Sequence, residues 1–202
     1  MYFSKRMQKN LIKKIVSGDY IIYELKLSAG VYVCDEEELR QVIDTMFIAW
    51  RKIVSSRSTG FIRRFDGIIR RLFFEWSEDE KGWNPYFHLI CVQKRKVLSA
   101  EEEYKLRLDE EKLRLSTYIK WLSAWVTALK LCTDVAVGFS ILDLKGLEKS
   151  LADFCTNEKY SVLVLVDELK EKLKSACGKH RLVSFHGIFR NLDADRHMSV
   201  ER

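Results

Sequence analysis

The chain has 202 residues, of which 47% are hydrophobic, so it is long enough and apolar enough to bury the core of one domain. One proline and nine glycines exclude a proline-rich or low-complexity chain, and no apolar run approaches the roughly 20 residues of a membrane span. The net charge of +6 is a modest excess, so its distribution along the chain matters more than its size.

The N-terminus is basic, but no apolar segment follows it, so it does not have the pattern of a secretory signal. Five cysteines are scattered without a Cys-x-x-Cys pair, which favours unpaired thiols in a reducing cytosol. We therefore expect a cytoplasmic protein with a basic N-terminal arm over residues 1–18, a single domain over 19–192 and a tail over 193–202.

The first predicted element is a strand over residues 19–30, which alternates in polarity and is rich in aromatic and β-branched side chains. A helix is predicted over 34–56, because apolar residues recur there every three or four positions. Asp35, with Glu38 three residues later, forms a capping-box pattern at its start. Two further strands, paired as a hairpin across the turn sequence EDEKGWNP, are predicted over 67–77 and 86–93.

The second half of the chain begins with a highly charged segment over 99–116, which predicts a solvated helical excursion from the domain. An amphipathic helix is predicted to follow, with an apolar face made of Tyr118, Leu122, Trp125, Val126 and Leu129. The remaining predictions are a strand over 134–143, helices over 144–156 and 161–178, and an extended closing segment over 179–192.

This order of elements predicts an α+β fold. Hairpin strands with interposed helices imply a central, mainly antiparallel sheet with the helices packed on one face. The arrangement belongs to the split βαβ kind of topology.

Positive charge is concentrated in the segment 51–71, which holds seven lysines and arginines against one acid, Asp66. This density is typical of proteins that contact phosphates, and the alternative is a solvated face with counterions. The candidate DNA-binding arginines are Arg57, Arg63, Arg64, Arg70 and Arg71, and we expect the last four to be the most exposed.

Four stretches of the chain carry a family resemblance. They are YIIYELKLSAG with the later FIAWRKIV, GIIRRLFFEW with WNPYFHLICV, WLSAWVTAL, and GKHRLVSFHGIFRNL. In this order they resemble the replication initiator (Rep) proteins of rolling-circle plasmids, within the HUH endonuclease superfamily. The resemblance implies an HUH fold and DNA as the partner, either single-stranded or at a plasmid origin. In active members, two histidines of one strand hold Mg²⁺ or Mn²⁺, and a tyrosine of a later helix attacks the scissile phosphate.

The metal-binding positions that the resemblance implies are altered in this chain. The family's pair of histidines corresponds to Tyr86 and His88, and a phenol is a poor ligand for a hard cation at neutral pH. The acidic position on the neighbouring strand falls on Phe73, and Glu75 substitutes for it only if the strand register slips. His88 is then a core histidine that remains from a former metal site.

The nucleophile that the resemblance implies is also altered. The family's tyrosine corresponds to Phe154, and the glutamate one helical turn earlier corresponds to Ser150. Two rescues are open: Tyr160 as the nucleophile under a different alignment, and His180 or His186 as additional metal ligands.

We therefore expect a Rep-like DNA-binding protein that is catalytically inactive and has no cofactor. In this interpretation Trp83, with Tyr86, is a candidate to stack on an unpaired base. The alternative is an active nicking-joining endonuclease that uses Tyr160 with Mg²⁺ or Mn²⁺. A weaker third interpretation is a protein-interaction module that no longer binds DNA. A second copy of the chain or an active initiator is a further candidate partner, and no membrane is expected.

Overall fold

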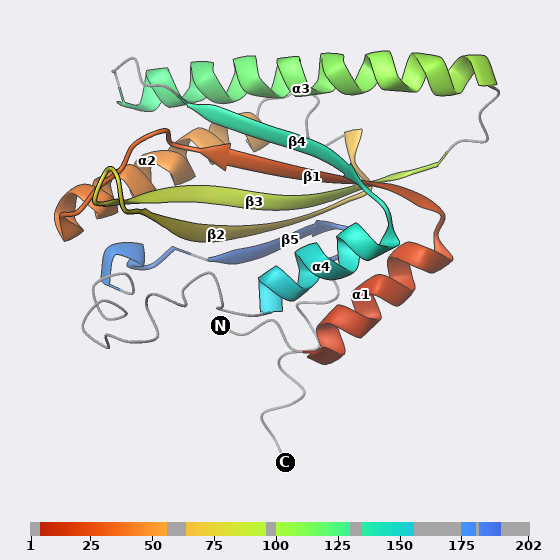
Figure 1. The fold of residues 1–202 in the computed structure, drawn as a ribbon, viewed down its shortest axis with the longest axis horizontal. Helices are drawn as coiled ribbons and strands as arrows, with labels where there is room; N and C mark the ends of the chain where they lie inside the picture. Colours follow the sequence, from red (N-terminus) through yellow and green to blue (C-terminus); the bar gives the residue numbers. More distant parts are fainter. Residues whose placement is uncertain are drawn as a thin grey trace.

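The structure is a computed structural model that describes residues 5–55, 64–95, 100–129, 135–155, 175–180 and 182–190. Its described residues form a five-stranded antiparallel sheet with helices around it (Figure 1). The strands are β1 (Tyr20–Ser28), β2 (Gly67–Ser77), β3 (Gly82–Lys94), β4 (Ala136–Leu142) and β5 (Val183–Gly187). The helices are α1 (Lys5–Ser17), α2 (Glu36–Ser55), α3 (Ala100–Leu129) and α4 (Leu144–Cys155). None of the described helices has both the length and the apolar composition needed to cross a membrane.

The sheet has the strand order β4-β1-β3-β2-β5, and every neighbouring pair is antiparallel. The predicted α+β class with an antiparallel sheet is therefore confirmed. The predicted hairpin is also present, with β2 paired to β3 from Gly67 opposite Val92 to Ser77 opposite Gly82. Because β3 lies in the centre, its backbone is paired on both sides.

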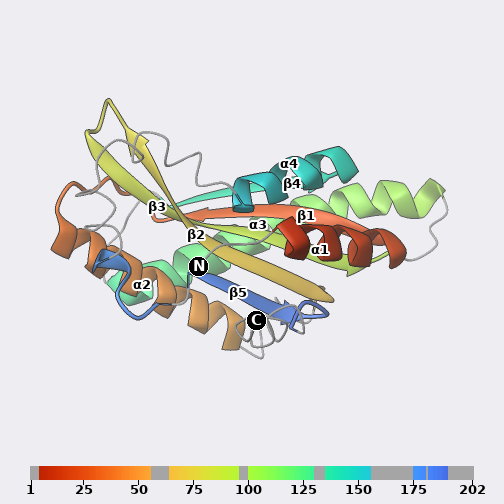
Figure 2. The same cartoon turned by 90° about the horizontal axis from the view of Figure 1, so that it is seen from below.

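The prediction that the helices lie on one face of the sheet is wrong. Alternate residues of β3 point to two different cores, so Phe87 packs with α2 and α3 while Ile90 packs with α1 and α4. In Figure 1, α3 lies above the sheet and α1 and α4 lie below it, and Figure 2 gives the view from below. The reason is visible in β3 itself, where every residue from Pro85 to Val92 is buried, as in a strand covered on both faces.

Helix α1 occupies residues that were expected to form a basic arm. Its Leu11 and Ile15, one turn apart, are buried in the core beneath the sheet, while Lys9 and Lys13 face solvent. Lys14 Nζ donates a hydrogen bond to the Ile188 carbonyl oxygen, at 2.6 Å. The N-terminal segment is thus an amphipathic helix whose many lysines obscure a short apolar face.

Helix α3 joins the two parts of the chain that were predicted as a charged excursion and an amphipathic helix. Among its described side chains, the buried ones are Leu113, Thr117, Trp121, Ala124 and Trp125. Of the predicted apolar face, Trp125 is fully buried, Leu122 and Val126 are partly buried, and Tyr118 is exposed. Trp121 Nε1 donates to the Ser28 carbonyl oxygen at 3.0 Å, which fixes the rotation of the helix over β1. Because Thr117 is polar, the buried face of α3 does not show a continuous apolar period in the sequence.

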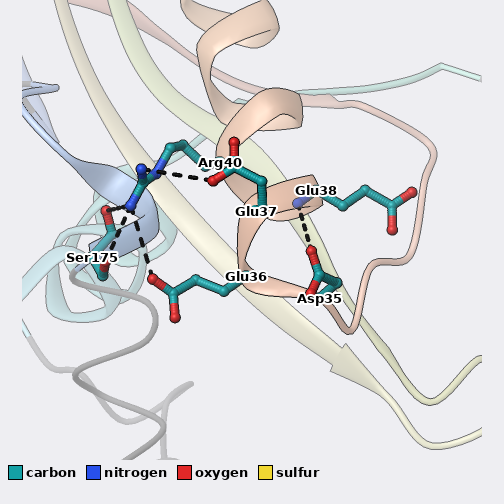
Figure 3. Close-up of polar contacts among 6 residues, drawn as sticks. All are labelled: Asp35, Glu36, Glu37, Glu38, Arg40 and Ser175. Atoms are coloured by element: carbon teal, nitrogen blue, oxygen red, sulfur yellow. Dashed lines mark hydrogen bonds and ion pairs between the residues drawn. The ribbon is translucent and has the colours of Figure 1, made fainter.

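The start of α2 is capped as predicted. Asp35 Oδ1 accepts a hydrogen bond from the Glu38 backbone N–H at 2.9 Å (Figure 3). The same turn of helix anchors the distant segment 175–180, because Arg40 donates to the Ser175 carbonyl and hydroxyl oxygens at 3.4 and 3.2 Å. Most of the helix predicted over 161–178 lies outside the described residues.

Candidate functional site

A buried polar cluster lies on the face of the sheet that α1 and α4 cover. His88 is near the middle of β3 and only 2% exposed. Its Nε2 atom lies 2.7 Å from Glu24 Oε1 on β1 and 3.2 Å from Ser150 Oγ on α4. Three side chains that are far apart in sequence therefore converge on one point inside the protein.

Glu24 is the acceptor at the centre of this cluster. Besides His88, the Ser150 hydroxyl donates to its Oε1 at 2.9 Å and the Ser140 hydroxyl donates to its Oε2 at 3.1 Å. The hydrogen bond from His88 is the main reason that the pKa of Glu24 falls to about 2, although burial opposes the shift. Since an ionised carboxylate only accepts hydrogen bonds, His88 Nε2 carries a proton here.

The cluster has the geometry of a structural hydrogen-bond network and not that of a catalytic triad. In a serine–histidine–acid triad, the histidine uses one ring nitrogen for the serine and the other for the acid. Here Glu24 and Ser150 both contact Nε2 of His88, and the Ser150 hydroxyl donates to the carboxylate. Ser150 is also buried, so this arrangement provides no activated nucleophile.

The residues around His88 do not fit the Mg²⁺ or Mn²⁺ site that the family resemblance implies. Tyr86 lies against Phe73, with ring centroids 5.6 Å apart, where a second imidazole and an acid would be needed. The strand register pairs Phe73 with Tyr86 and Glu75 with Asn84, so it has not slipped to bring Glu75 to the site. Nε2 of His88 is already engaged by Glu24 Oε1, at 2.7 Å. In the described part of the chain, no group of three or more His, Cys, Asp or Glu side chains could hold a metal ion.

The structure brings together some of the residues predicted from the sequence and not others. Ser150 of α4 does lie against His88, and Phe154 is one turn further along the same helix, although its side chain is not among those described. Tyr160 lies outside the described residues. His180 stacks on Phe47 of α2, which belongs to the core on the opposite face of the sheet, so it does not contribute to this cluster.

Glu24 is the residue that sequence reasoning missed. It lies in the predicted first strand, two residues before Lys26, which is paired directly with His88. A carboxylate at a strand position flanked by the buried Tyr23 and Leu25 was the available signal, since acids are rarely placed within buried strands without a partner.

The expected exposure of Arg70 and Arg71 is contradicted. They are only 3% and 7% exposed, because successive residues of β2 point into the two cores. The Arg70 guanidinium lies over the ring of Phe47 at 4.6 Å, and that of Arg71 lies over Phe73 at 4.8 Å. Of the other candidate arginines, Arg64 is exposed, while Arg57 and Arg63 lie outside the described residues.

The aromatic residues proposed to stack on DNA are also buried. Trp83 is 4% exposed and packs on Trp76 with ring centroids 4.9 Å apart. Tyr86 is 5% exposed beneath the same side of the sheet as His88. In this conformation neither ring offers a face to a base.

Exposed lysines are present instead on the helices that cover the His88 face of the sheet. Helices α1 and α4 contact each other, and they lie on the opposite side of the sheet from α2 (Figure 2). Among the side chains of these two helices that the structure describes, the exposed charged ones are one acid, Glu148, and four lysines: Lys9, Lys13, Lys145 and Lys149. We call these four residues the helix-layer lysines. They form the charge pattern expected of a phosphate-binding surface.

The low pKa of Glu24 leads to a test in acid. A folded-state pKa of about 2, against 4.5 for the ordinary group, means that this carboxylate stabilises the fold above pH 4.5 and loses that effect as the pH falls toward 2. We expect the free energy of unfolding to fall less steeply between those pH values in Glu24→Gln than in the parent, measured by urea denaturation. Identical pH profiles would contradict the assigned pairing.

Comparison of the chain with protein-family models, with curated proteins and with solved structures found no match.

Proposed function

We propose that this protein is a Rep-like DNA-binding protein, related to rolling-circle replication initiators, that does not cleave DNA. Support comes from the ordered set of sequence motifs and from where the key positions lie. His88 is on the central strand of an antiparallel sheet, and α4 carries positions 150 and 154 across the same face. A histidine strand with a later helix laid across it is the layout that the resemblance implies.

The loss of catalysis rests on the chemistry of the cluster around His88. Cleavage needs a cation on the phosphate oxygens and an oxygen nucleophile in line with the phosphorus. Glu24 and Ser150 hold the one remaining imidazole, and Phe73 and Tyr86 fill the space beside it. The polar groups of a former reaction centre thus serve to tie β1, β3 and α4 together.

The observation that carries the binding part of the proposal is the set of helix-layer lysines over that same face. A phosphate backbone that once ran past the histidine would meet these side chains first. Binding of this kind is electrostatic, so it is weakened by salt and depends little on base sequence. The exposed cations Arg51, Lys52 and Arg64 of the basic segment are the second candidate surface.

The binding experiment compares the two surfaces. Single-stranded and duplex oligonucleotides are titrated at several salt concentrations with the parent and two variants, one with the four helix-layer lysines changed to Gln and one with Arg51, Lys52 and Arg64 changed to Gln. We expect the first variant to bind more weakly and to lose about 0.7–0.9 units of log–log salt slope per lost contact. A loss confined to the second variant would move the surface to the basic segment. Salt-insensitive or absent binding by the parent would reject DNA as the partner.

Cleavage is tested separately. The parent is incubated with single-stranded DNA and Mn²⁺, and covalent protein–DNA adducts are sought on denaturing gels. We expect neither product nor adduct. An adduct that disappears in Tyr160→Phe would overturn the inactive assignment and make Tyr160 the nucleophile.

A further inference from the structure

Helix α3 carries a row of exposed apolar side chains on the side that faces away from the sheet. Its members recur at spacings of four, seven and four residues, which places them on one face of the helix. The row, which we call the α3 stripe, consists of Tyr104 (67% exposed), Leu108 (48%), Leu115 (54%) and Ile119 (54%). Tyr118, 37% exposed, lies beside it. Large apolar side chains aligned in this way are costly to leave in water.

The first part of α3 places none of its described side chains in the core. Among the described side chains of this helix, Leu113 is the first in the core, and Asp109 and Glu110 before it line a hollow at the edge of the core with Tyr23 and Gln93. Figure 1 shows α3 along the upper edge of the molecule, with the sheet on one side of it and no described element on the other. A segment of about 12 residues is marginal as an isolated helix in water, so packing from outside would stabilise it.

We infer that the α3 stripe is a self-association surface, on which a second copy of this chain packs its own α3 in the antiparallel direction. The stripe is symmetric about the point between Glu111 and Lys112. A two-fold axis at that point sets Leu108 against Leu115 of the second copy and Tyr104 against Ile119 of the second copy. A surface that is its own complement under a two-fold rotation is what a symmetric dimer requires, whereas an unrelated partner would not need this symmetry.

The charges beside the stripe suit the same arrangement. Arg107, Glu111 and Arg114 lie along one edge of it, at spacings of four and three residues. In an antiparallel pair of helices, this edge faces the same edge of the partner, so the two Glu111 carboxylates lie near the axis, each flanked by Arg114 of its own helix and by Arg114 of the other copy. Glu111 already accepts hydrogen bonds from Arg114 of its own helix, so both groups are charged and in position. On the other edge, Lys112 Nζ lies 3.6 Å from Asp109 Oδ1 of the same helix. This ion pair reduces the repulsion between the two copies of Lys112 near the axis.

The association is tested by light scattering after size exclusion, over a series of concentrations of the full chain. We expect the parent to have twice the chain mass, and Leu108→Glu or Leu115→Glu to have the mass of one chain, with a dissociation constant weakened by more than about tenfold. The matched control is Ile48→Glu on α2, which is 39% exposed and lies outside the stripe. It should remain dimeric. A monomeric parent at every concentration, or a control that dissociates like the stripe variants, would overturn the inference.

The direction of pairing is tested by cross-linking in a Cys34→Ser background, since Cys34 is exposed. Leu108→Cys and Leu115→Cys are oxidised singly and as a mixture. The antiparallel pairing brings residue 108 of one copy to residue 115 of the other, so the mixture should form a disulfide-linked dimer more efficiently than either variant alone. Equal cross-linking of each variant with itself would indicate parallel helices and would overturn the proposed arrangement. Circular dichroism of each variant checks that α3 is still folded.

Discussion

Replacing Glu24 with alanine is expected to destabilise the protein by about 3 kcal/mol, because it leaves the buried His88 and Ser150 without their shared acceptor. The cluster joins β1, β3 and α4, so the substitution weakens both the sheet and the packing of α4 against it. The measurement is the free energy of unfolding from urea denaturation at neutral pH, followed by tryptophan fluorescence. A loss smaller than about 1 kcal/mol would mean that solvent readily replaces Glu24.

The matched control is Ser140→Ala. Ser140 donates to the other oxygen of the same carboxylate, but it is exposed on the edge strand β4. Water can take its place, so the expected loss is below about 1 kcal/mol. A large effect at Ser140 and a small one at Glu24 would place the important contact at the edge of the sheet rather than around His88.

Replacing Trp121 with alanine is expected to cost about 3–5 kcal/mol of unfolding free energy. Its side chain is fully buried, packs on Trp125 and Phe87, and donates through Nε1 to the Ser28 carbonyl oxygen. The alanine variant leaves a cavity between α3 and the sheet and removes the hydrogen bond to the Ser28 carbonyl oxygen of β1. Urea denaturation followed by circular dichroism measures both the stability and the helix content.

Trp121→Phe separates the two contributions. Phenylalanine keeps most of the buried ring but has no N–H to donate, so we expect a loss of about 1–2 kcal/mol. If the two variants are equally destabilised, the hydrogen bond to Ser28 dominates and the packing of the ring adds little.

Local patterns in the sequence determined most of the secondary structure. The alternation in β1, the apolar period of α2 with its Asp35 cap and the hairpin of β2 and β3 are all present in the structure. These elements could be predicted because their signals depend on neighbouring residues and on the fixed periods of helices and strands. The antiparallel sheet then followed from the short hairpin connection.

Only the tertiary structure decided which side chains the helices cover. Helix α1 was not predicted, because its many lysines obscure its short apolar face in the sequence. The packing of Leu11 and Ile15 against the lower face of the sheet holds this segment in position. The same covering of the second face buries Arg71, which the sequence presented as part of a basic surface. Charge counts along a chain do not reveal whether a strand is buried on one face or on both, because that depends on elements far away in sequence.

Part of the candidate site could likewise be predicted from the sequence, and part of it could not. Family resemblance in the sequence singled out His88, Tyr86, Phe73 and Ser150, and the structure does bring these four side chains to one face of the sheet. Glu24, the acceptor that decides the chemistry of His88, emerged only from the fold, since 64 residues separate the two. A hydrogen bond between neighbouring strands of a sheet depends on strand order and register, and neither is written in the local pattern of either strand.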